Sequence, residues 1–362
     1  MIDHLIKENR CFAFYRLPQE NHIHFLIQNN HSPDILRHVE ELNNQNAFVI
    51  APFHTSKEHP IVLIRPEKEE IMAIPEISIK EEYKSIDASF PDDNYKLRFS
   101  TFANAVKGNQ FEKLVLSRKQ EMLREPYFSP EHAFFLACKK YIYSYVYICH
   151  TPQTGTWIGC TPEILLSNSS KNWQTVALAG TQPLPSENEQ SAIWDEKNKL
   201  EQRMVADYIR KQLALYNIEP IEKGPYTVRA GKLVHLKSDF YFSLPDNHRL
   251  GNLLNDLHPT PAICGLPKTE AKQFILENEG YNRSYYSGFI GRLQPTGNTN
   301  LYVNLRCMQV EDQKLTLYAG GGILPSSALN DEWIETENKL QTMLVLSKAN
   351  ILSSEGRSQT ND

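Results

Sequence analysis

The 362-residue chain has no long hydrophobic run and no cluster of basic residues. No stretch of about 18 apolar residues could form a transmembrane helix, and residues 1–17 lack the apolar segment of a signal peptide. Lysine and arginine number 38 against 43 acidic residues, a net charge of −5 that argues against nucleic acid as a ligand. We therefore expect a cytoplasmic protein that binds neither membranes nor nucleic acid.

Cysteine is scarce and shows no pairing motif. The six cysteines include no CxxC pair, and several lie inside apolar runs. This pattern is typical of reduced, buried thiols rather than of a disulfide framework or a zinc site. Four histidines near the N-terminus also lack a cysteine or carboxylate that completes a metal-ligand spacing. We expect these to be surface or core residues: His22, His24, His54 and His59.

The composition is that of a folded protein with a large core. With 41% hydrophobic residues, the chain could form two domains or one α/β or α+β domain. Near the N-terminus, apolar patterns predict strands at Cys11–Arg16, 23–27 and 47–52 and a helix over 32–43. The polar residues 353–362 are expected to form a disordered tail.

One segment, residues 318–343, combines consecutive glycines with a predicted helix. A β-type run at 315–318 leads into the glycines 320–322, a predicted turn whose bare amides could bind an anion. Asn330 is a plausible N-cap for the helix that follows. The expected buried stripe of this helix consists of Trp333, Thr336, Leu340 and Met343.

A second stripe on the same helix carries charge. Glu332, Glu335 and Lys339 recur at three- and four-residue spacing and therefore share a face. Two carboxylates and an ammonium beside an anion-binding turn could hold a metal ion and an acidic ligand together. Taken alone, the segment favours the simpler interpretation of a capped surface helix with solvated charges.

Three further charged residues lie beside apolar runs. Lys113 begins a predicted strand, where it is either a solvated edge charge or, if buried, a group that loses its proton easily and acts as a base. Glu163 follows a Thr-Pro turn; it is either an exposed turn residue or a buried general acid with a raised pKa. Glu201 lies on the apolar face of a helix predicted over 194–213, and it needs a lysine, an arginine or a metal as its partner.

The remaining elements frame a pocket. His235 lies in a predicted strand pair, and Ala262 lies in a proline-rich, irregular loop of the kind that shapes a pocket. Residues 281–293 and 301–310 are predicted to supply further strands. Two residues in these strands are candidate contacts for anions: Tyr286 and Arg306.

Nine motifs in a single order resemble those of the chorismate-utilising enzymes. They are KLVLSR, GCTPE, ALAGTQP, LEQRMV, LVHLKSDF, HPTPAICGLPK, YSGFIGRL, YAGGGI and EWIETENKL. This family includes isochorismate synthase, salicylate synthase, anthranilate synthase component I and aminodeoxychorismate synthase. The resemblance covers residues 95–350, whereas 1–94 resemble the variable N-terminal part of the family only weakly. It implies one α+β domain over 1–352, with two packed antiparallel sheets, helices outside, and an active site between the sheets.

The resemblance also implies roles for individual residues. Glu201 and Glu335 match the direct ligands of Mg²⁺, and Glu332 matches a carboxylate that reaches the ion through water. Such an ion would bind the ring carboxylate of chorismate. The other matched positions are the catalytic-site residue His235 and residues that contact the substrate or line its pocket, namely Gly180, Thr181, Ala262, Tyr286, Arg306, the amide of Gly320, and Lys339. A departure is Asn198, where some relatives carry an acid, and this difference would weaken Mg²⁺ binding.

Within this family, the nucleophile decides the reaction. Lys113 matches the base with which isochorismate and salicylate synthases deprotonate water, and aminating members do not keep it. Glu163 matches the acid that protonates the departing 4-hydroxyl; the pair requires a lowered lysine pKa and a raised glutamate pKa. Ala262 stands where salicylate and anthranilate synthases carry threonine, which favours a reaction that stops at isochorismate.

We therefore expect a monomeric, Mg²⁺-dependent isochorismate synthase that acts on chorismate in menaquinone or siderophore biosynthesis. Three alternatives stay open. The chain could be a salicylate synthase, an aminating enzyme of the anthranilate or aminodeoxychorismate type, or a non-catalytic chorismate-binding subunit.

Overall fold

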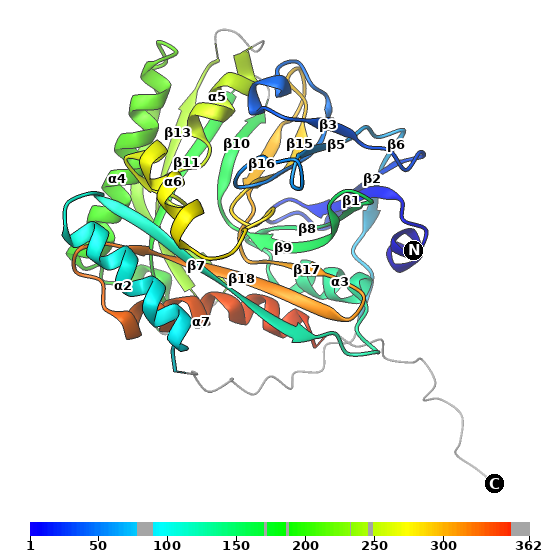
Figure 1. Cartoon of the computed structure of the whole chain (residues 1–362). Helices are drawn as coiled ribbons and strands as arrows, with labels where there is room; N and C mark the ends of the chain where they lie inside the picture. Colours follow the sequence, from blue (N-terminus) through cyan, green and yellow to red (C-terminus); the bar gives the residue numbers. More distant parts are fainter. Residues whose placement is uncertain (78–89, 170–171, 186–187, 232, 245–248, 349–362) are drawn as a thin grey trace.

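Two large antiparallel sheets form the centre of the molecule (Figure 1). The structure is a computed structural model that describes residues 1–77, 90–169, 172–185, 188–231, 233–244 and 249–348. The first sheet has the spatial order β14 (Gly265–Leu266), β7 (Lys113–Leu123), β18 (Lys314–Ile323), β17 (Cys307–Val310), β9 (Gly155–Thr161), β8 (Tyr145–Thr151), β1 (Cys11–Arg16), β2 (His22–Gln28) and β6 (Lys68–Ala73). The second has the order β12 (Ile221–Ala230), β13 (Leu233–Phe242), β11 (Asn172–Pro183), β10 (Ile164–Ser169), β16 (Asn300–Val303), β15 (Phe289–Leu293), β4 (Ala47–Ala51), β5 (Ile61–Ile64) and β3 (Asp34–Leu36).

Strand β8 shows why the sheets pack face to face. All seven of its residues are buried. Because side chains alternate between the faces of a strand, Tyr145 and Tyr147 point into the core between the sheets, whereas Val146 and Ile148 point into the core beneath the helices. A strand that is buried on both faces reads as a continuous apolar run.

The helices cover the outer faces of the two sheets (Figure 1). They are α1 (Ile2–Lys7), α2 (Asp93–Lys107), α3 (Pro130–Lys140), α4 (Glu196–Ala214), α5 (Leu250–Leu257), α6 (Lys268–Asn278) and α7 (Leu329–Leu346), with the 3₁₀ helices η1 (Val39–Leu42) and η2 (Glu189–Ser191). Helix α7 packs on β18 and α4 packs on β11. The predicted α+β fold of two antiparallel sheets with outer helices is therefore confirmed.

The N-terminal strands are part of both sheets. Strands β1, β2 and β6 extend the first sheet, and β3, β4 and β5 extend the second. The expected tail at 353–362 lies outside the described residues.

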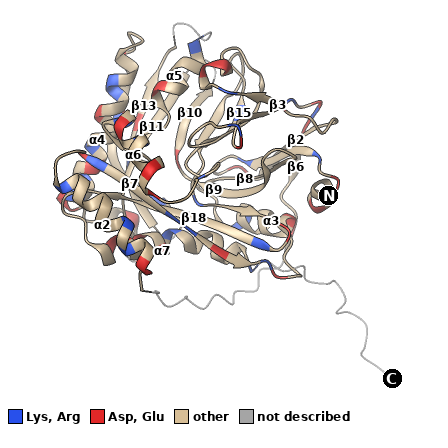
Figure 2. Ribbon diagram, in the orientation of Figure 1, with Lys and Arg blue, Asp and Glu red and all other residues tan. Residues whose placement is uncertain are grey.

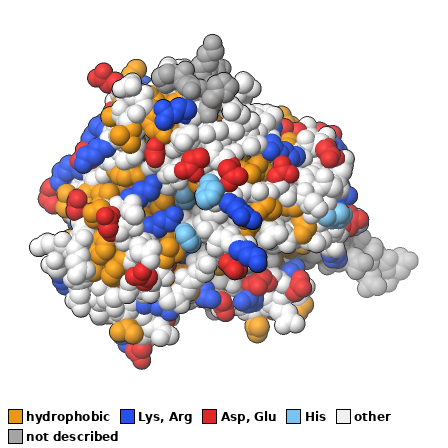
Figure 3. All heavy atoms as spheres, turned by 45° about the horizontal axis from the view of Figure 1, so that its top comes forward, with side chains coloured by type: hydrophobic (Ala, Val, Ile, Leu, Met, Phe, Trp, Pro, Cys, Tyr) orange, Lys and Arg blue, Asp and Glu red, His pale blue; other side chains and the backbone are white. Residues whose placement is uncertain are grey.

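Charged residues of both signs are distributed over the helices and strands (Figure 2). The face shown in Figure 3 mixes acidic, basic and apolar side chains. No helix in the described ranges is long and apolar enough to cross a membrane. All six cysteines are free and buried, as predicted.

Two predicted elements, over 32–43 and over 281–293, differ in the structure. The helix predicted over 32–43 is wrong: this stretch forms the short strand β3, which pairs with β5, and the single 3₁₀ turn η1. The apolar residues there recur at helical spacing, but pairing with a neighbouring strand outweighs that local preference. The strand predicted over 281–293 is confirmed only for β15, because Ser284 and Ser287 adopt positive φ angles of 52° and 58° and interrupt an extended chain.

Candidate active site

The glycines 320–322 lie inside strand β18, so the predicted glycine turn is wrong. Gly320, Gly321 and Gly322 continue the ladder with β7, opposite Ser117, Leu116 and Val115. Their role is steric. A Cβ on Gly322 would lie 2.4 Å from Oε1 of Glu201, and one on Gly321 would lie 3.0 Å from Oε2 of Glu332. The glycines therefore leave room for carboxylates above the strand.

Helix α7 begins slightly earlier than predicted. It starts at Leu329 with Ala328 as its N-cap and no capping side chain, so the predicted cap at Asn330 is wrong. The predicted buried stripe is confirmed for Trp333, Thr336, Leu340 and Met343. This stripe turns the acidic face of the helix towards the glycines of β18.

Three carboxylates and three lysines meet above these glycines. Each carboxylate pairs with one ammonium group, and the pairs are Lys113–Glu201 at 2.7 Å, Lys197–Glu332 at 2.5 Å and Lys339–Glu335 at 2.7 Å. Lys113 begins β7, whereas Glu201 and Lys197 come from α4, and the other three come from α7. Lys113 is therefore the partner that Glu201 was predicted to need.

The electrostatics of the carboxylates differ. Burial alone would raise the pKa of Glu201, but the Lys113 ammonium outweighs this effect and the pKa is lowered. The pKa of Glu332 is raised, because its side chain is buried and because it lies near Glu335. Burial alone would lower the pKa of Lys197, but its contact with Glu332 outweighs this effect and the pKa is raised.

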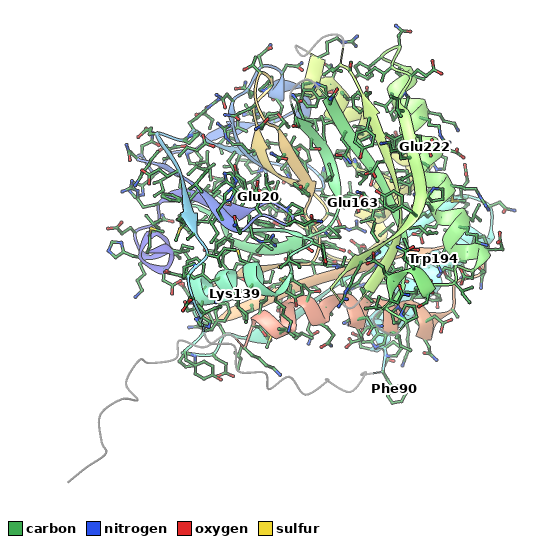
Figure 4. All side chains as sticks on the ribbon, turned by 180° about the vertical axis from the view of Figure 1, so that it is seen from behind. Glu20, Phe90, Lys139, Glu163, Trp194 and Glu222 are labelled. Carbon is green, nitrogen blue, oxygen red and sulfur yellow. The ribbon has the colours of Figure 1, made fainter. Side chains whose placement is uncertain are left out.

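Glu163 is buried at the start of β10, with only 2% of its surface exposed. Figure 4 shows it among the strands in the middle of the molecule, far inside the peripheral Glu222 and Trp194. Burial raises its pKa to about 8, although nearby Lys113 opposes the shift. The hydroxyl of Thr260 donates to Oε1 at 3.5 Å. The structure therefore excludes an exposed turn acid and supports a carboxyl that holds a proton at pH 7.

His235 and Arg306 form a buried pair on the second wall. Nη2 of Arg306 lies 2.5 Å from Nε2 of His235, and Nδ1 of the ring lies 3.1 Å from Oγ1 of Thr181 and 3.2 Å from the carbonyl of Gly180. Burial and the guanidinium together hold the pKa of His235 well below its usual value. Because a guanidinium only donates, Nε2 accepts and Nδ1–H donates to Gly180. His235 is thus a neutral residue that orients Arg306.

Arg306 reaches this position through its backbone. It lies between β16 and β17, which belong to different sheets, so the strand predicted over 301–310 is in fact two strands. Arg306 has φ +45° where the chain crosses over. Such a conformation is costly for a side-chain-bearing residue and is found mostly at functional positions. Burial lowers the pKa of Arg306 to about 10, so it stays cationic at pH 7.

Tyr286 and Lys339 lie beside Gly320. A Cβ on Gly320 would lie 2.9 Å from the hydroxyl of Tyr286, and Nζ of Lys339 donates to the carbonyl of Gly320 at 2.8 Å. Tyr286 stacks on Tyr318 with ring centroids 5.2 Å apart. Burial raises the pKa of Tyr286, so its hydroxyl remains a donor.

These residues surround one cavity of about 680 Å³, its open mouth included, between the two sheets. Eleven of the thirteen residues predicted for the site line it: Glu163, Gly180, Thr181, Glu201, His235, Ala262, Tyr286, Arg306, Gly320, Glu335 and Lys339. The other two, Lys113 and Glu332, are buried and do not line the cavity. Lys113 pairs with the lining residue Glu201, whereas Glu332 pairs with Lys197, which does not line the cavity either.

Several residues of the site were missed in the sequence. Lys197 precedes Glu201 by one helical turn, a spacing that could have flagged it. Asn198, noted in the sequence because some relatives carry an acid there, accepts a hydrogen bond from the backbone N–H of Thr181 at 3.0 Å and so holds the end of β11. Behind the cavity, Arg283 donates twice to Glu279 at 2.6 Å. These two residues are four apart, a spacing that could have flagged them as well.

The Arg283–Glu279 pair connects two walls of the cavity. Arg283 also donates to the carbonyls of Ile263 and Val115, both at 2.8 Å. These carbonyls flank Ala262 in the loop and Lys113 in β7. The buried pair thus fixes the loop against the strand that carries the predicted base.

The chain is similar to several isochorismate synthases. It is 31% identical over 207 residues to the isochorismate synthase EntC of Escherichia coli K12, an alignment that covers 55% of this chain and 53% of the relative. It is 25% identical over 318 residues to the vibriobactin-specific isochorismate synthase of Vibrio cholerae, covering 84% of this chain and 80% of the relative. The chain thus spans about half the length of the first of these curated relatives.

The fold is also that of a solved structure. MenF, the menaquinone-specific isochorismate synthase of Escherichia coli, superimposes with a TM-score of 0.78 at 20% identity, over 96% of this chain and 91% of that one. The family model described as chorismate binding enzyme matches residues 38–346, so the match begins well before the predicted limit at 95. Since that match spans most of the chain, the protein belongs to the family of chorismate-binding enzymes.

Proposed function

We propose that the chain is an isochorismate synthase, which adds water to C2 of chorismate as the 4-hydroxyl leaves. The observation that carries this proposal is Glu163, a buried carboxyl of the cavity wall with a pKa of about 8 and Lys113 as a charged neighbour. A carboxyl that keeps its proton at pH 7 is suited to protonate a departing hydroxyl. The names of the relatives support the same reaction.

In this mechanism the proton transfers balance. Lys113, whose ammonium pairs with Glu201, would first give up its own proton and would then take one from the water whose oxygen ends on C2. The ring double bonds shift, and Glu163 gives its proton to the 4-hydroxyl, which departs as water. Arg306, Tyr286 and Lys339 supply donors and positive charge for the two carboxylates of the substrate. In the reverse reaction Lys113 donates a proton and Glu163 accepts one.

Mg²⁺ is the proposed metal. The donor set of Glu201, Glu335 and Glu332 consists of carboxylates, which this hard cation prefers. The missing Cβ atoms of Gly321 and Gly322 leave space beside those oxygens. When bound, the ion would neutralise charge on the substrate carboxylate. Because each carboxylate pairs with a lysine here, metal binding would replace ammonium contacts.

Titration of activity with MgCl₂ tests this ligand set. Glu201→Gln and Glu335→Gln should each raise the Mg²⁺ concentration for half-maximal activity by at least about tenfold, because each removes one proposed ligand. Glu196→Gln is the matched control, since this carboxylate lies on the same helix but is exposed. An Mg²⁺ dependence that both site variants share with the wild type would reject the assignment.

The reaction itself is tested by incubating purified protein with chorismate and Mg²⁺, without an ammonia source, and resolving the products by chromatography. Isochorismate in equilibrium with chorismate is the expected result. Salicylate with pyruvate would mean that the pocket around Ala262 also eliminates pyruvate. Turnover that requires ammonia or a glutaminase would indicate an aminating enzyme, and binding without turnover would indicate a non-catalytic subunit.

We further propose a monomer that acts in the cytoplasm. All six cysteines are free thiols, which suits a reducing compartment. The relatives serve both menaquinone and siderophore pathways by name, so we propose isochorismate as the product and leave its consumer to either pathway.

A further inference from the structure

A second group of metal-ligating side chains lies on the hairpin of β1 and β2, and it consists of Glu20, His22 and His24. One ligand atom from each residue lies within 4.8 Å of the other two. In the described ranges this is the one group of three or more such side chains with that spacing. Figure 4 shows Glu20 beside the N-terminal strands, on a different part of the molecule from Glu163.

The hairpin brings the three side chains together. His22 and His24 are two residues apart on β2 and therefore point to the same face of the sheet. Strand β2 is held on both sides, by β1 and by β6, so the spacing of the two imidazoles is fixed by the ladder. Glu20 lies in the turn before β2, where its backbone N–H donates to the carbonyl of Leu17, and its carboxylate folds back over the strand.

The distances are close to those of a zinc site. Oε2 of Glu20 lies 2.9 Å from Nε2 of His24 and 3.3 Å from Nε2 of His22. In a tetrahedral Zn²⁺ site with bonds of about 2.0 to 2.1 Å, neighbouring ligand atoms are about 3.3 Å apart. Small rotations of the side chains would therefore suffice to bind an ion.

The surroundings of the imidazoles favour Nε2 as the ligand. Nε2 of both rings faces the carboxylate of Glu20, at 3.3 Å for His22 and 2.9 Å for His24, and an ion bound there would displace the proton of these contacts. Nδ1 of His22 lies 3.4 Å from Oδ1 of Asn21, which can accept the proton of the Nδ1–H tautomer once Nε2 binds the ion. The ring of His24 stacks on Tyr15, with centroids 4.9 Å apart and planes 8° apart. Both rings are thus oriented before any ion arrives.

The group is accessible, and no lysine or arginine of the described residues forms an ion pair with Glu20. The side chains of Glu20, His22 and His24 are 29%, 33% and 22% exposed, which leaves room for water as a fourth ligand. Within the described residues, the ion pairs of Glu20 are to these two histidines, whereas each carboxylate of the cavity holds a lysine. Two imidazoles and one carboxylate suit Zn²⁺ better than Mg²⁺.

We propose that Glu20, His22 and His24 bind one Zn²⁺ ion, at a site separate from the cavity between the sheets. The sequence interpretation treated these histidines as ordinary because it paired them with no carboxylate. Glu20 is only two residues before His22, but the turn, not the spacing, brings its carboxylate within reach. The ion would link the turn to β2 and stabilise the end of the first sheet.

The test is a titration of metal-free, full-length protein with ZnCl₂ in competition with a chromophoric chelator. An excess of MgCl₂ keeps the carboxylates of the cavity occupied. We expect one equivalent of zinc per chain, bound at least about tenfold more weakly by Glu20→Gln and by His24→Gln. His4→Gln is the matched control, because His4 and Glu8 form a pair at 3.4 Å that lacks a third ligand in the cluster.

Two outcomes would overturn the proposal. One is no stoichiometric zinc in the wild-type protein, which would leave a hydrogen-bonded surface cluster. The other is one equivalent of zinc that still binds to Glu20→Gln and to His24→Gln but no longer binds to Glu201→Gln, which would place the ion in the cavity. The proposal is supported if zinc binding is lost in Glu20→Gln and His24→Gln but kept in Glu201→Gln. Adding ZnCl₂ should also raise the unfolding temperature of the wild type but not that of His24→Gln.

Discussion

The carboxyl of Glu163 lies among strands of both sheets, and its pKa of about 8 follows mainly from that burial. In the unfolded chain it would lose its proton near pH 4.5, the ordinary value. Between these two values the folded state binds one more proton than the unfolded state. The free energy of unfolding therefore falls as pH rises from about 4.5 to about 8 through this group.

Replacement of Glu163 tests both its chemistry and this linkage. Glu163→Gln should lower turnover of chorismate by about 10²- to 10⁴-fold, because the amide donates no proton to the leaving hydroxyl. In the wild type, activity should decline above about pH 8 as the carboxyl ionises. Denaturant unfolding at pH 5 and at pH 8 gives a second measurement, in which the variant should lose less stability than the wild type between the two pH values. An equal loss in both proteins would contradict the assigned pKa.

Lys113 has no surface exposed to solvent, and its ammonium contacts Glu201. Lys113→Ala should reduce turnover by at least about 10²-fold while Mg²⁺-dependent binding of chorismate is kept. It should also lower the free energy of unfolding by about 3 kcal/mol, since Glu201 would be left as a buried charge without a partner.

A double variant separates these two effects of Lys113. Lys113→Met with Glu201→Gln removes both charges, so it should recover most of the lost stability but none of the turnover. Turnover is measured by product chromatography and stability by denaturant unfolding. Wild-type turnover in Lys113→Ala would remove this residue from the mechanism.

At the scale of elements, the site depends on two helices, α4 and α7, that pack on the strands preceding them. Each helix directs acids towards the glycines of β18. The hydrophobic stripe of α7 was predictable because a period of 3.6 residues follows from helix geometry alone. The extended conformation of the three glycines could not be predicted, because glycine fits a turn and a strand equally well. The ladder with β7 decides between the two.

Gly322→Ala tests the steric role of β18. The added Cβ would lie 2.4 Å from Oε1 of Glu201 and 2.9 Å from Cε of Lys113, so this ion pair must move. We expect kcat/KM to fall by at least about tenfold, with a loss of about 1 to 3 kcal/mol in stability. Gly297→Ala is the control, since its Cβ would meet only the side chain of Gln294. Equal activity in both variants would reject the steric explanation.

At the scale of the whole molecule, Arg16 connects β1 to the segment after α3. Its guanidinium is fully buried and donates to four carbonyls, those of Leu17, Tyr141, Ile142 and Ser144, at 2.6 to 3.1 Å. Because Arg16 does not line the cavity, we expect it to serve stability rather than chemistry.

Arg16→Met should lower the free energy of unfolding by about 2 to 4 kcal/mol, because it leaves buried carbonyls without donors. The kcat of the folded protein should stay within about twofold of the wild type. Denaturant unfolding and product assays on the same preparation measure both. Arg37→Met, at an exposed position, is the control. A selective loss of kcat without a loss of stability would link this segment to the site instead.

The sequence by itself determined what depends on neighbours along the chain. An apolar run predicted β1, helical periodicity predicted the buried stripe of α7, and the ordered motifs identified eleven of the residues that line the cavity. These features are local, so short-range geometry and burial preferences suffice to predict them.

Only the tertiary structure decided which distant groups meet. It paired Lys113 with Glu201, buried Glu163, and brought Glu20 over His22 and His24. Strand pairing also replaced the helix predicted over 32–43 with β3. Ion pairs, desolvation and ladder hydrogen bonds depend on distances across the fold, and sequence spacing does not specify these distances.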